Sequence, residues 1–268
     1  MPIFWLEIGL VTKKLDVLYE DNHLLVVNKP FGLATMGLPA GEETLFTRSK
    51  DYIAEKYQKP GNVYLGIVSR LDTLVTGVVV FARTSKAADR LNEQFRAHTV
   101  EKQYLAVVEG AIPPEGTLHD WIKECSHSRK CYVTKDVQGK EVARFEKNAQ
   151  VAQDGPAKEA ILHFRRLRRL ELNRSLVEVW LETGRKHQIR VQLSHAGYPI
   201  LGDWKYGSRN FVTDSGRKPS RRKSEARIAL HARSLTIQHP TRDEKMTFIA
   251  PIPAFWGAFG LAQSDFTE

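Results

Sequence analysis

The segment Gly77–Arg83 (GVVVFAR) constrains the fold of this chain more than any other part of the sequence. Nearly all of its side chains are apolar, so as a strand it must be covered on both faces. Thr84 then offers an N-cap for a helix over residues 86–98, in which Leu91 and Phe95 lie on one face. We therefore expect a central strand that leads directly into a packed helix.

An aspartate stands just before this strand. The sequence runs Arg70-Leu71-Asp72, and residues i and i+2 of an extended segment point to the same side, so Arg70 and Asp72 would lie side by side. One interpretation is an ion pair that closes a hairpin. The other is a single reactive carboxylate held on a rigid edge above a groove. The pattern by itself leaves both open.

The rest of the chain contains more strand-like than helix-like segments. Helices are expected over 42–58 and 185–197, the latter with Gly197 at its C′ position. Strands are expected from His23 to the turn at Pro30, in 102–110, in three runs between Glu141 and Thr183, and in 228–240 and 246–253. We expect an α+β fold with a mixed, largely antiparallel sheet, flanking helices and a central cleft.

The charge of the chain indicates an anionic partner. The formal net charge is +9 and the pI is near 9.5. Residues 163–174 hold five arginines in an expected strand, and the loop 208–227 holds seven basic residues against two acidic ones. No amphipathic basic helix with an aromatic face is visible in the sequence, which argues against membrane binding. A groove for phosphates is favoured over an idle charged surface.

Cysteine use and the N-terminus indicate the compartment. Cys125 and Cys131 are the only cysteines, which gives no basis for a disulfide framework and favours a reducing compartment. The first 14 residues lack a basic leader and a cleavage site, and their apolar part is too short to span a bilayer. A cytoplasmic protein is expected.

Familiar cofactor and metal motifs are absent from the sequence. It contains no GxxxxGK[ST], GxGxxG or GxSxG segment. His119, Cys125, His127 and Cys131 cluster, but without the CxxC pair of a standard zinc site. The clustered carboxylates of a two-metal nuclease do not stand out either. We expect no metal and no cofactor.

The segment 182–190 (ETGRKHQIR) concentrates cations where a helix is expected to begin. Arg185, Lys186, His187 and Arg190 would crowd the first turns of that helix. A helix N-terminus favours anions, so cations there disfavour the isolated helix. An anionic ligand, or a buried acid such as Asp72, is the expected partner of these residues.

Six segments in a fixed order resemble one family. The chain resembles the RluA-type pseudouridine synthases from about Val17 to Pro253, and the resemblance implies an RNA pseudouridine synthase with that family's fold and with RNA as its partner. The matching segments are VLYEDNHLLVVNKPFGLAT, SRLDTLVTGVVVFART, EKQYLAVVEG, LETGRKHQIR, GYPILGDWKYG and IALHARSLTIQHP.

The resemblance also implies residue roles. Asp72 corresponds to the nucleophilic aspartate, Arg70 to an arginine that acts in flipping out the target base, and Tyr104 to a tyrosine against the uracil. Arg190 corresponds to the arginine that pairs with the catalytic carboxylate. Further RNA contacts are expected from Arg185, Lys186, His187 and Lys29, although Lys29 and His187 have structural interpretations of equal weight.

The chain departs from the family pattern in three places. Ser69 and Gln192 each replace a usual histidine, and Val75-Thr76 replaces a usual Thr-Ser pair. These changes alter the surroundings of the pocket and leave the four assigned residues in place. The pattern begins at about Val17, so we expect residues 1–16 to be an extension and 17–268 the catalytic domain, with no S4-like domain.

Three function classes remain after this reading. The leading one is a synthase that uses Asp72, and its rival is a non-catalytic RNA-binding protein on the same scaffold. A nucleoside glycosidase would need two carboxylates about 5–10 Å apart, and only one candidate is visible. The target could be ribosomal or transfer RNA. A monomer is expected because the family is often monomeric, and Trp121, Trp180 and Trp204 are expected in the core or on a sheet face.

Overall fold

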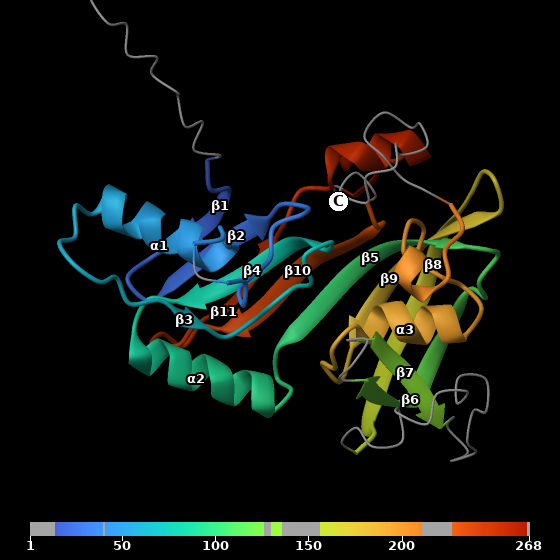
Figure 1. Ribbon diagram of the computed structural model, residues 1–268, viewed down its shortest axis with the longest axis horizontal. Coiled ribbons are helices and arrows are strands. Elements are labelled where there is room, and N and C mark those ends of the chain that lie inside the picture. Colours follow the sequence, from blue (N-terminus) through green and yellow to red (C-terminus); the bar gives the residue numbers. More distant parts are fainter. Residues whose placement is uncertain (1–13, 40, 126–129, 136–155, 211–226, 267–268) are drawn as a thin grey trace, which may run out of the picture.

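The computed structural model describes residues 14–39, 41–125, 130–135, 156–210 and 227–266. In these residues one sheet is flanked by helices, which confirms the α+β class (Figure 1). The α-helices are α1 (Leu45–Lys56), α2 (Ser85–Arg96) and α3 (Gln188–His195). The strands are β1 (Val17–Glu20), β2 (Leu24–Lys29), β3 (Gly66–Ile67), β4 (Thr76–Ala82), β5 (Glu101–Glu109), β6 (Glu115–Cys125), β7 (Lys130–Lys135), β8 (Lys158–Leu170), β9 (Arg174–Leu181), β10 (Leu230–Gln238) and β11 (Lys245–Ile249).

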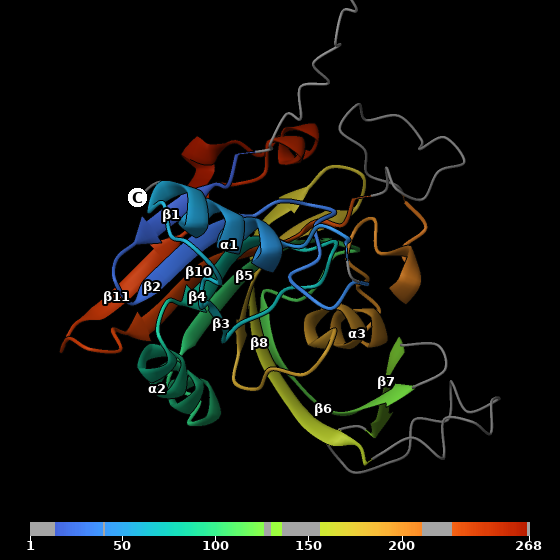
Figure 2. The same ribbon diagram turned by 60° about the vertical axis from the view of Figure 1, so that its left-hand side comes forward.

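The sheet runs in the order β1-β2-β4-β10-β5-β9-β8-β6-β7, with β3 paired to β4 and β11 to β10. Among the pairings between described strands, only β4 with β10 is parallel. The expected mixed, largely antiparallel sheet is therefore confirmed. Figure 2 shows β6 and β8 curving around α3 on their way to β7.

The apolar segment Gly77–Arg83 forms most of β4, which is central in the sheet, as expected. All seven residues of β4 are buried between β2 and β10. Its side chains alternate between two apolar clusters, with Val80 on the α2 side and Phe81 on the α1 side. Thr84 caps α2 by accepting a hydrogen bond from the backbone N–H of Ala87. A continuous apolar run is thus required because helices cover both faces of β4.

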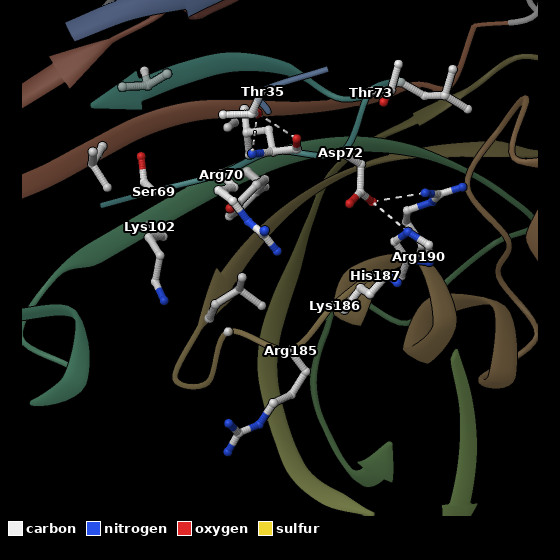
Figure 3. A pocket seen from close by; sticks show the side chains of 18 of the residues that line it. Thr35, Ser69, Arg70, Asp72, Thr73, Lys102, Arg185, Lys186, His187 and Arg190 are labelled. Atoms are coloured by element: carbon white, nitrogen blue, oxygen red, sulfur yellow. Dashed lines mark hydrogen bonds and ion pairs between the residues drawn. The ribbon is translucent and has the colours of Figure 1, made fainter. Parts of the chain in front are cut away.

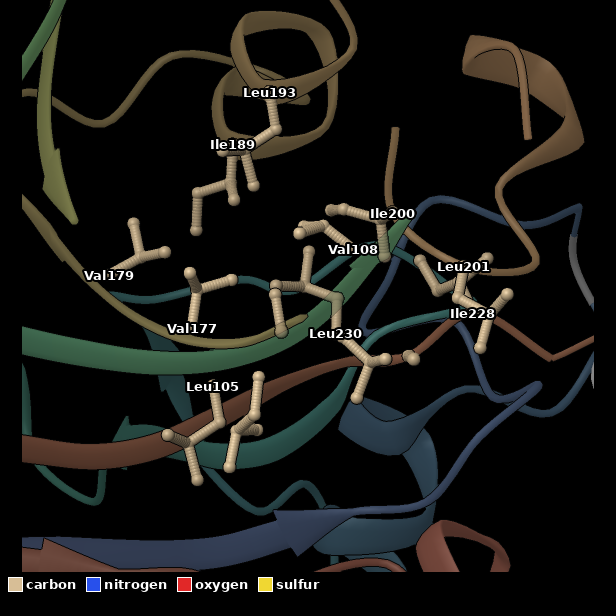
Figure 4. Packing of buried hydrophobic residues seen from close by; sticks show 14 of the residues in the cluster. Leu105, Val108, Val177, Val179, Ile189, Leu193, Ile200, Leu201, Ile228 and Leu230 are labelled. Carbon is tan, nitrogen blue, oxygen red and sulfur yellow. The ribbon is translucent and has the colours of Figure 1, made fainter. Parts of the chain in front are cut away.

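A third apolar cluster holds α3 against β5 and β9 (Figure 4). Ile189 and Leu193, one turn apart on α3, face Val177 and Val179 of β9. This packing fixes the helix that carries Arg190, because Ile189 precedes it directly in the chain.

The two halves of the sheet meet at Gly77. Its φ is +116°, and a Cβ atom there would lie 2.1 Å from the carbonyl oxygen of Ala232 on β10. The parallel pairing of Gly77 with Ala232 therefore requires a glycine, both for backbone conformation and for space. The join lies five residues after Asp72.

We expect Gly77→Ala to lower the free energy of unfolding by about 3 kcal/mol or more, because overpacking and positive-φ strain add. Urea unfolding followed by circular dichroism measures this. Gly257→Ala is the matched control, since a Cβ there meets nothing within 4 Å, and it should change stability by less than about 0.5 kcal/mol. Equal stability of the two variants would contradict the tight join.

One expected helix begins later than predicted, and two expected segments lie outside the described residues. The helix expected over 185–197 begins at Gln188, because its side-chain oxygen accepts from the backbone N–H of Arg185 and closes a turn before the helix. Gly197 follows the Ala196 C-cap with φ +93°, as a C′ residue does. The first strand run after Glu141 and residues 211–226 of the basic loop lie outside the described residues. In the part described, no helix is long and apolar enough to cross a membrane.

Candidate active site

A cavity of about 950 Å³ forms where the loop 67–74, β5, the segment 184–190 and β10 meet (Figure 3). This cavity is the central cleft expected from the sequence. Most of the sequence-predicted residues line it, and they come from segments far apart in the chain: Arg70, Asp72, Tyr104, Arg185, Lys186, His187 and Arg190.

Asp72 stands at the first position of a tight turn that precedes β4. The backbone N–H of Val75 donates to the Asp72 carbonyl oxygen at 3.0 Å and closes the turn. The carboxylate is 28% exposed and faces the cavity. Residues 68–72 are not part of a strand, and in the described part of the chain Asp72 forms no ion pair with Arg70. The hairpin-closing interpretation is therefore wrong.

Arg190 is the partner of Asp72. Its Nη1 donates to Asp72 Oδ2 at 2.9 Å, while its Nε and Nη2 donate to both carboxylate oxygens of Asp203 at 2.6 and 2.9 Å. Burial alone would lower the pKa of Arg190, but Asp203 and then Asp72 raise it above the ordinary value. The guanidinium is a permanent cation that fixes the position of the Asp72 carboxylate.

Asp203 is a residue that the sequence reading missed. It is 1% exposed and takes the bidentate side of Arg190, so Arg190 gives Asp72 a single hydrogen bond. The signal was present, since Asp203 lies in GYPILGDWKYG, one of the six segments of the family resemblance, but this residue was given no role from the resemblance. Asp203 leaves one N–H of the planar guanidinium directed at the Asp72 carboxylate.

His187 lies beside the same carboxylate. Its Nε2 is 3.6 Å from Asp72 Oδ2, and its Nδ1 is 2.6 Å from the hydroxyl of Tyr206. Burial, more than the opposing charge of Asp72, lowers the pKa of His187 to about 4. The imidazole is therefore neutral near pH 7, and it binds through hydrogen bonds rather than charge.

This pKa makes the stability of the protein depend on pH. Between pH 6.5, the ordinary value for histidine, and about 4, the unfolded chain binds a proton that folded His187 does not. The free energy of unfolding should therefore fall by up to about 3 kcal/mol as the pH is lowered through this range. Urea titrations at each pH measure it.

His187→Asn should remove this part of the pH dependence, since asparagine tolerates the left-handed φ of +55°. The control is His98→Asn, because His98 is exposed and has the same backbone conformation, with φ +56°. A wild-type pH slope in the His187 variant would contradict a buried neutral imidazole.

Tyr104 lies on β5 and lines the cavity. Burial, followed by the negative charge of Asp72, raises the pKa of its hydroxyl above the ordinary value. The phenol therefore stays protonated and offers a ring face and a donor, not a base. This placement suits a flat base held against the ring.

The expectation that Lys29 contacts RNA or faces solvent needs correction. Its side chain is 0% exposed, and its Nζ donates to the carbonyl oxygens of Pro30, Leu33 and Thr73 at 2.7–3.1 Å. Burial lowers the pKa of Lys29 to about 7, against the opposing charge of Asp72. Its role is to tie the 30–33 turn to the residue after Asp72.

The other expected RNA contacts differ in how free they are. Arg70 is exposed in the cavity, with no hydrogen bond or ion pair to any described residue. Arg185 donates to the carbonyl oxygen of Glu159, and Lys186 forms an ion pair with Glu124 on β6. Arg70 thus has its full charge available, whereas Lys186 must leave Glu124 to bind another anion.

The three departures from the family pattern have structural roles. The Ser69 hydroxyl bonds to both the N–H and the carbonyl of Val80, and so continues the pairing of β3 with β4. Thr76 contacts the buried ring of His231 at 2.8 Å. Gln192 donates to Asp120 and to backbone carbonyls under α3. Only Ser69 also lines the cavity.

The cysteine–histidine cluster forms no metal site in the described residues. Cys125 and Cys131 are free and buried, and His127 lies outside that part of the structure. The arginines of β8 do not line the cavity; Arg165 pairs with Glu178, and Arg168 donates to the Gly260 carbonyl. Their expected contact with RNA stays a prediction.

Two further cavity residues were not expected from the sequence. Trp204 was expected in the core or on a sheet face, but it is 46% exposed and lines the cavity, because it opens the short 3₁₀ turn Trp204–Tyr206 after Asp203. Lys102, on β5, lines the opposite part of the cavity.

Comparison with known proteins supports the same assignment. The profile of the family described as RNA pseudouridylate synthase matches residues 23–195, which include Asp72, Tyr104 and Arg190. The chain belongs to this family. The RluA-type resemblance seen in the sequence is thereby confirmed.

Relatives in the family include enzymes named for two kinds of RNA. The chain is 34% identical over 244 residues to ribosomal large subunit pseudouridine synthase D of Xylella fastidiosa, covering 89% of this chain and 66% of that protein. It is 32% identical over 270 residues to tRNA pseudouridine synthase C of Haemophilus ducreyi, covering 94% and 99%. The chain spans 58% of the length of the related synthase D of Neisseria meningitidis serogroup A.

Solved structures of the family have the same fold. Human RNA pseudouridylate synthase domain containing 4 matches with a TM-score of 0.69 at 27% identity, over 91% of this chain and 90% of that one. The pseudouridine synthase fold is therefore shared by this family member.

Proposed function

We propose that this protein is an RNA pseudouridine synthase with Asp72 as its nucleophile. The observation that carries the proposal is the charge pattern of the cavity. Among its described lining residues, Asp72 is the only acid, and it stands among six arginines and lysines: Arg70, Lys102, Arg185, Lys186, Arg190 and Lys205. A cationic cavity suits a phosphate backbone, and a single carboxylate suits covalent catalysis.

The proposed reaction leaves the elemental composition of the nucleoside unchanged. The Asp72 carboxylate attacks the ribose C1′ as the N1–C1′ bond breaks, and the freed uracil turns against Tyr104. Uracil C5 then bonds to C1′ and displaces the carboxylate. The C5 proton leaves to solvent, and N1 gains a proton. No electron is gained or lost overall, so this chemistry requires no redox cofactor.

Each neighbour of Asp72 has a task in this proposal. Arg190 holds the carboxylate in place, and Asp203 keeps Arg190 from enclosing it in a bidentate pair. Arg70, exposed at the cavity, replaces the target base in the RNA when that base is turned out. The ring of Tyr104 compensates part of the lost stacking.

The rival functions are less well supported. A glycosidase of the usual kind needs a second carboxylate in the cavity, and Asp203, which shares Arg190 with Asp72, does not line the cavity and is bound on both oxygens by Arg190. A pure RNA-binding protein has no use for an acid among phosphates, where it repels them. The synthase accounts for both acids.

The proposal is tested by tritium release from RNA labelled at uracil C5. The full chain is incubated with ribosomal RNA and, separately, transfer RNA from cells that lack it. Release from one pool supports the synthase and identifies the RNA class. Tight RNA binding without release from either pool would overturn it in favour of the binding protein. We also propose that the protein is a monomer that acts in the cytoplasm, with one catalytic domain over residues 17–268. Light scattering of the protein without RNA tests the monomer.

A further inference from the structure

Lys102 occupies the end of the cavity away from Asp72. It lies on β5 two residues before Tyr104, so both side chains leave the strand on the same side and line the cavity. Figure 3 shows Lys102 extending into the cavity on the side of Ser69 and Arg70, with Asp72 and Arg190 at the other end. The two ends are joined by one continuous space of about 950 Å³.

The ammonium of Lys102 has no acceptor in the part of the chain that the structure describes. Within the described residues it forms no hydrogen bond or ion pair, whereas Lys29 has three carbonyl partners and Lys186 has Glu124. The side chain is half-buried, and burial lowers the pKa of Lys102. A desolvated charge without a partner costs free energy, which an anionic ligand at this place would recover.

Lys102 is not a counterion of the nucleophile. The charge of Asp72 acts on the pKa values of Lys29, Tyr104 and His187, while burial alone accounts for that of Lys102. Its task is therefore distinct from the task of Arg190.

The residue opposite Lys102 leaves its ammonium open. A Cβ atom at Gly184 would lie 3.6 Å from Lys102 Nζ, in ordinary contact. Gly184 has no positive φ, so its backbone conformation does not require glycine. What the glycine provides is free access to the ammonium from the cavity, which Gly184 also lines.

We propose that Lys102 forms a subsite for the phosphodiester of a nucleotide that flanks the target uridine, so that the cavity takes up a segment of RNA rather than one nucleoside. The inference rests on the proposed function, which supplies RNA as the ligand. Arg70 lies between this subsite and Asp72 in Figure 3, so the RNA would pass Arg70 between the target uridine and the flanking phosphodiester.

The test compares Lys102→Met, Lys102→Arg and the control Lys86→Met, an exposed lysine of α2 that is not in the cavity. We expect Lys102→Met to lower kcat/KM for pseudouridine formation by about tenfold, through KM, with kcat within about twofold. The dependence of log(kcat/KM) on log[KCl] should become shallower by about 0.7–0.9, the contribution of one phosphate contact. Lys102→Arg should retain most of the activity, and Lys86→Met all of it.

A second measurement locates the phosphate. Single methylphosphonates, which are uncharged, replace each phosphate next to the target uridine. One of these substitutions should lower kcat/KM of the wild-type enzyme about tenfold and leave kcat/KM of Lys102→Met unchanged, because the two changes remove the same contact. Equal effects of every substitution on both proteins would overturn the proposal, as would a loss confined to kcat, which would place Lys102 at the uracil.

Failure of the proposed function gives a different result. If the wild-type chain releases no tritium, the same variants and methylphosphonate RNAs are compared by fluorescence anisotropy. The phosphate subsite then still predicts weaker binding and a shallower salt dependence for Lys102→Met alone. Unchanged binding would overturn the subsite independently of catalysis.

Discussion

Asp72→Asn is expected to lower the rate of pseudouridine formation by at least about 10³-fold, because an amide cannot act as the nucleophile. The substitution is nearly isosteric, and the amide oxygen can still accept the hydrogen bond from Arg190 Nη1. RNA binding should be unchanged or tighter, since the only acid among the described cavity residues, which repels phosphates, becomes neutral.

Single-turnover tritium release and RNA binding by anisotropy measure the two effects separately. The control is Asp89→Asn on α2, an exposed acid that is not in the cavity, and it should behave as wild type in both. Loss of binding together with activity in Asp72→Asn would mean that the carboxylate supports the structure of the cavity. Retained activity would exclude Asp72 as the nucleophile.

Asp203→Asn is expected to have the largest effect on stability. Arg190 is 4% exposed, and the substitution removes the charge that holds its bidentate side. Breaking one partner of a buried pair costs about 3–5 kcal/mol, because the other charge stays buried. Arg190 would then turn toward Asp72 and occupy both of its oxygens, so we also expect kcat to fall about 100-fold.

Urea unfolding and single-turnover rates measure these two effects, with Glu244→Gln as the control. Glu244 forms an exposed ion pair with Arg242, and its loss should cost less than about 0.5 kcal/mol. If Asp203→Asn does not fold, the double variant Arg190→Met/Asp203→Asn should recover stability but not activity, since the two most deeply buried charges are then both removed and Asp72, which is 28% exposed, remains hydrated. Wild-type stability and rate in Asp203→Asn would contradict the coupling.

The sequence allowed the local elements to be predicted because their signals are local. The apolar run of β4, the Thr84 cap and Gly197 after α3 each depend on neighbours within a few residues. The parallel pairing of β4 with β10 could not be predicted, because it joins Thr76 to His231, 155 residues later. Gly77 is the residue that permits this pairing, but a single glycine in a sequence does not indicate which strand will lie against it.

The site was predictable where the family resemblance assigns a role to a particular residue, and incompletely elsewhere. Asp72, Tyr104 and Arg190 have such roles and meet in one cavity. Lys29 was misread because a lysine before a turn gives no sign that three carbonyls will surround it. Asp203 and Lys102 were missed because their roles depend on tertiary contacts. Asp203 binds Arg190, whereas Lys102 has no acceptor among the described residues, and neither composition nor spacing indicates this.

The parallel pairing of β4 with β10 affects how the protein folds during its synthesis on the ribosome. Synthesis completes the Asp72 turn early, but the inner neighbour of β4 is β10, and the salt bridge that orients the carboxylate needs Arg190 and Asp203. A nascent chain that ends before β10 leaves one edge of β4 unpaired, and one that ends before Arg190 also leaves Asp72 without its ion-pair partner. The cavity around Asp72 is therefore complete only after β10, the last strand that lines it, has been synthesised.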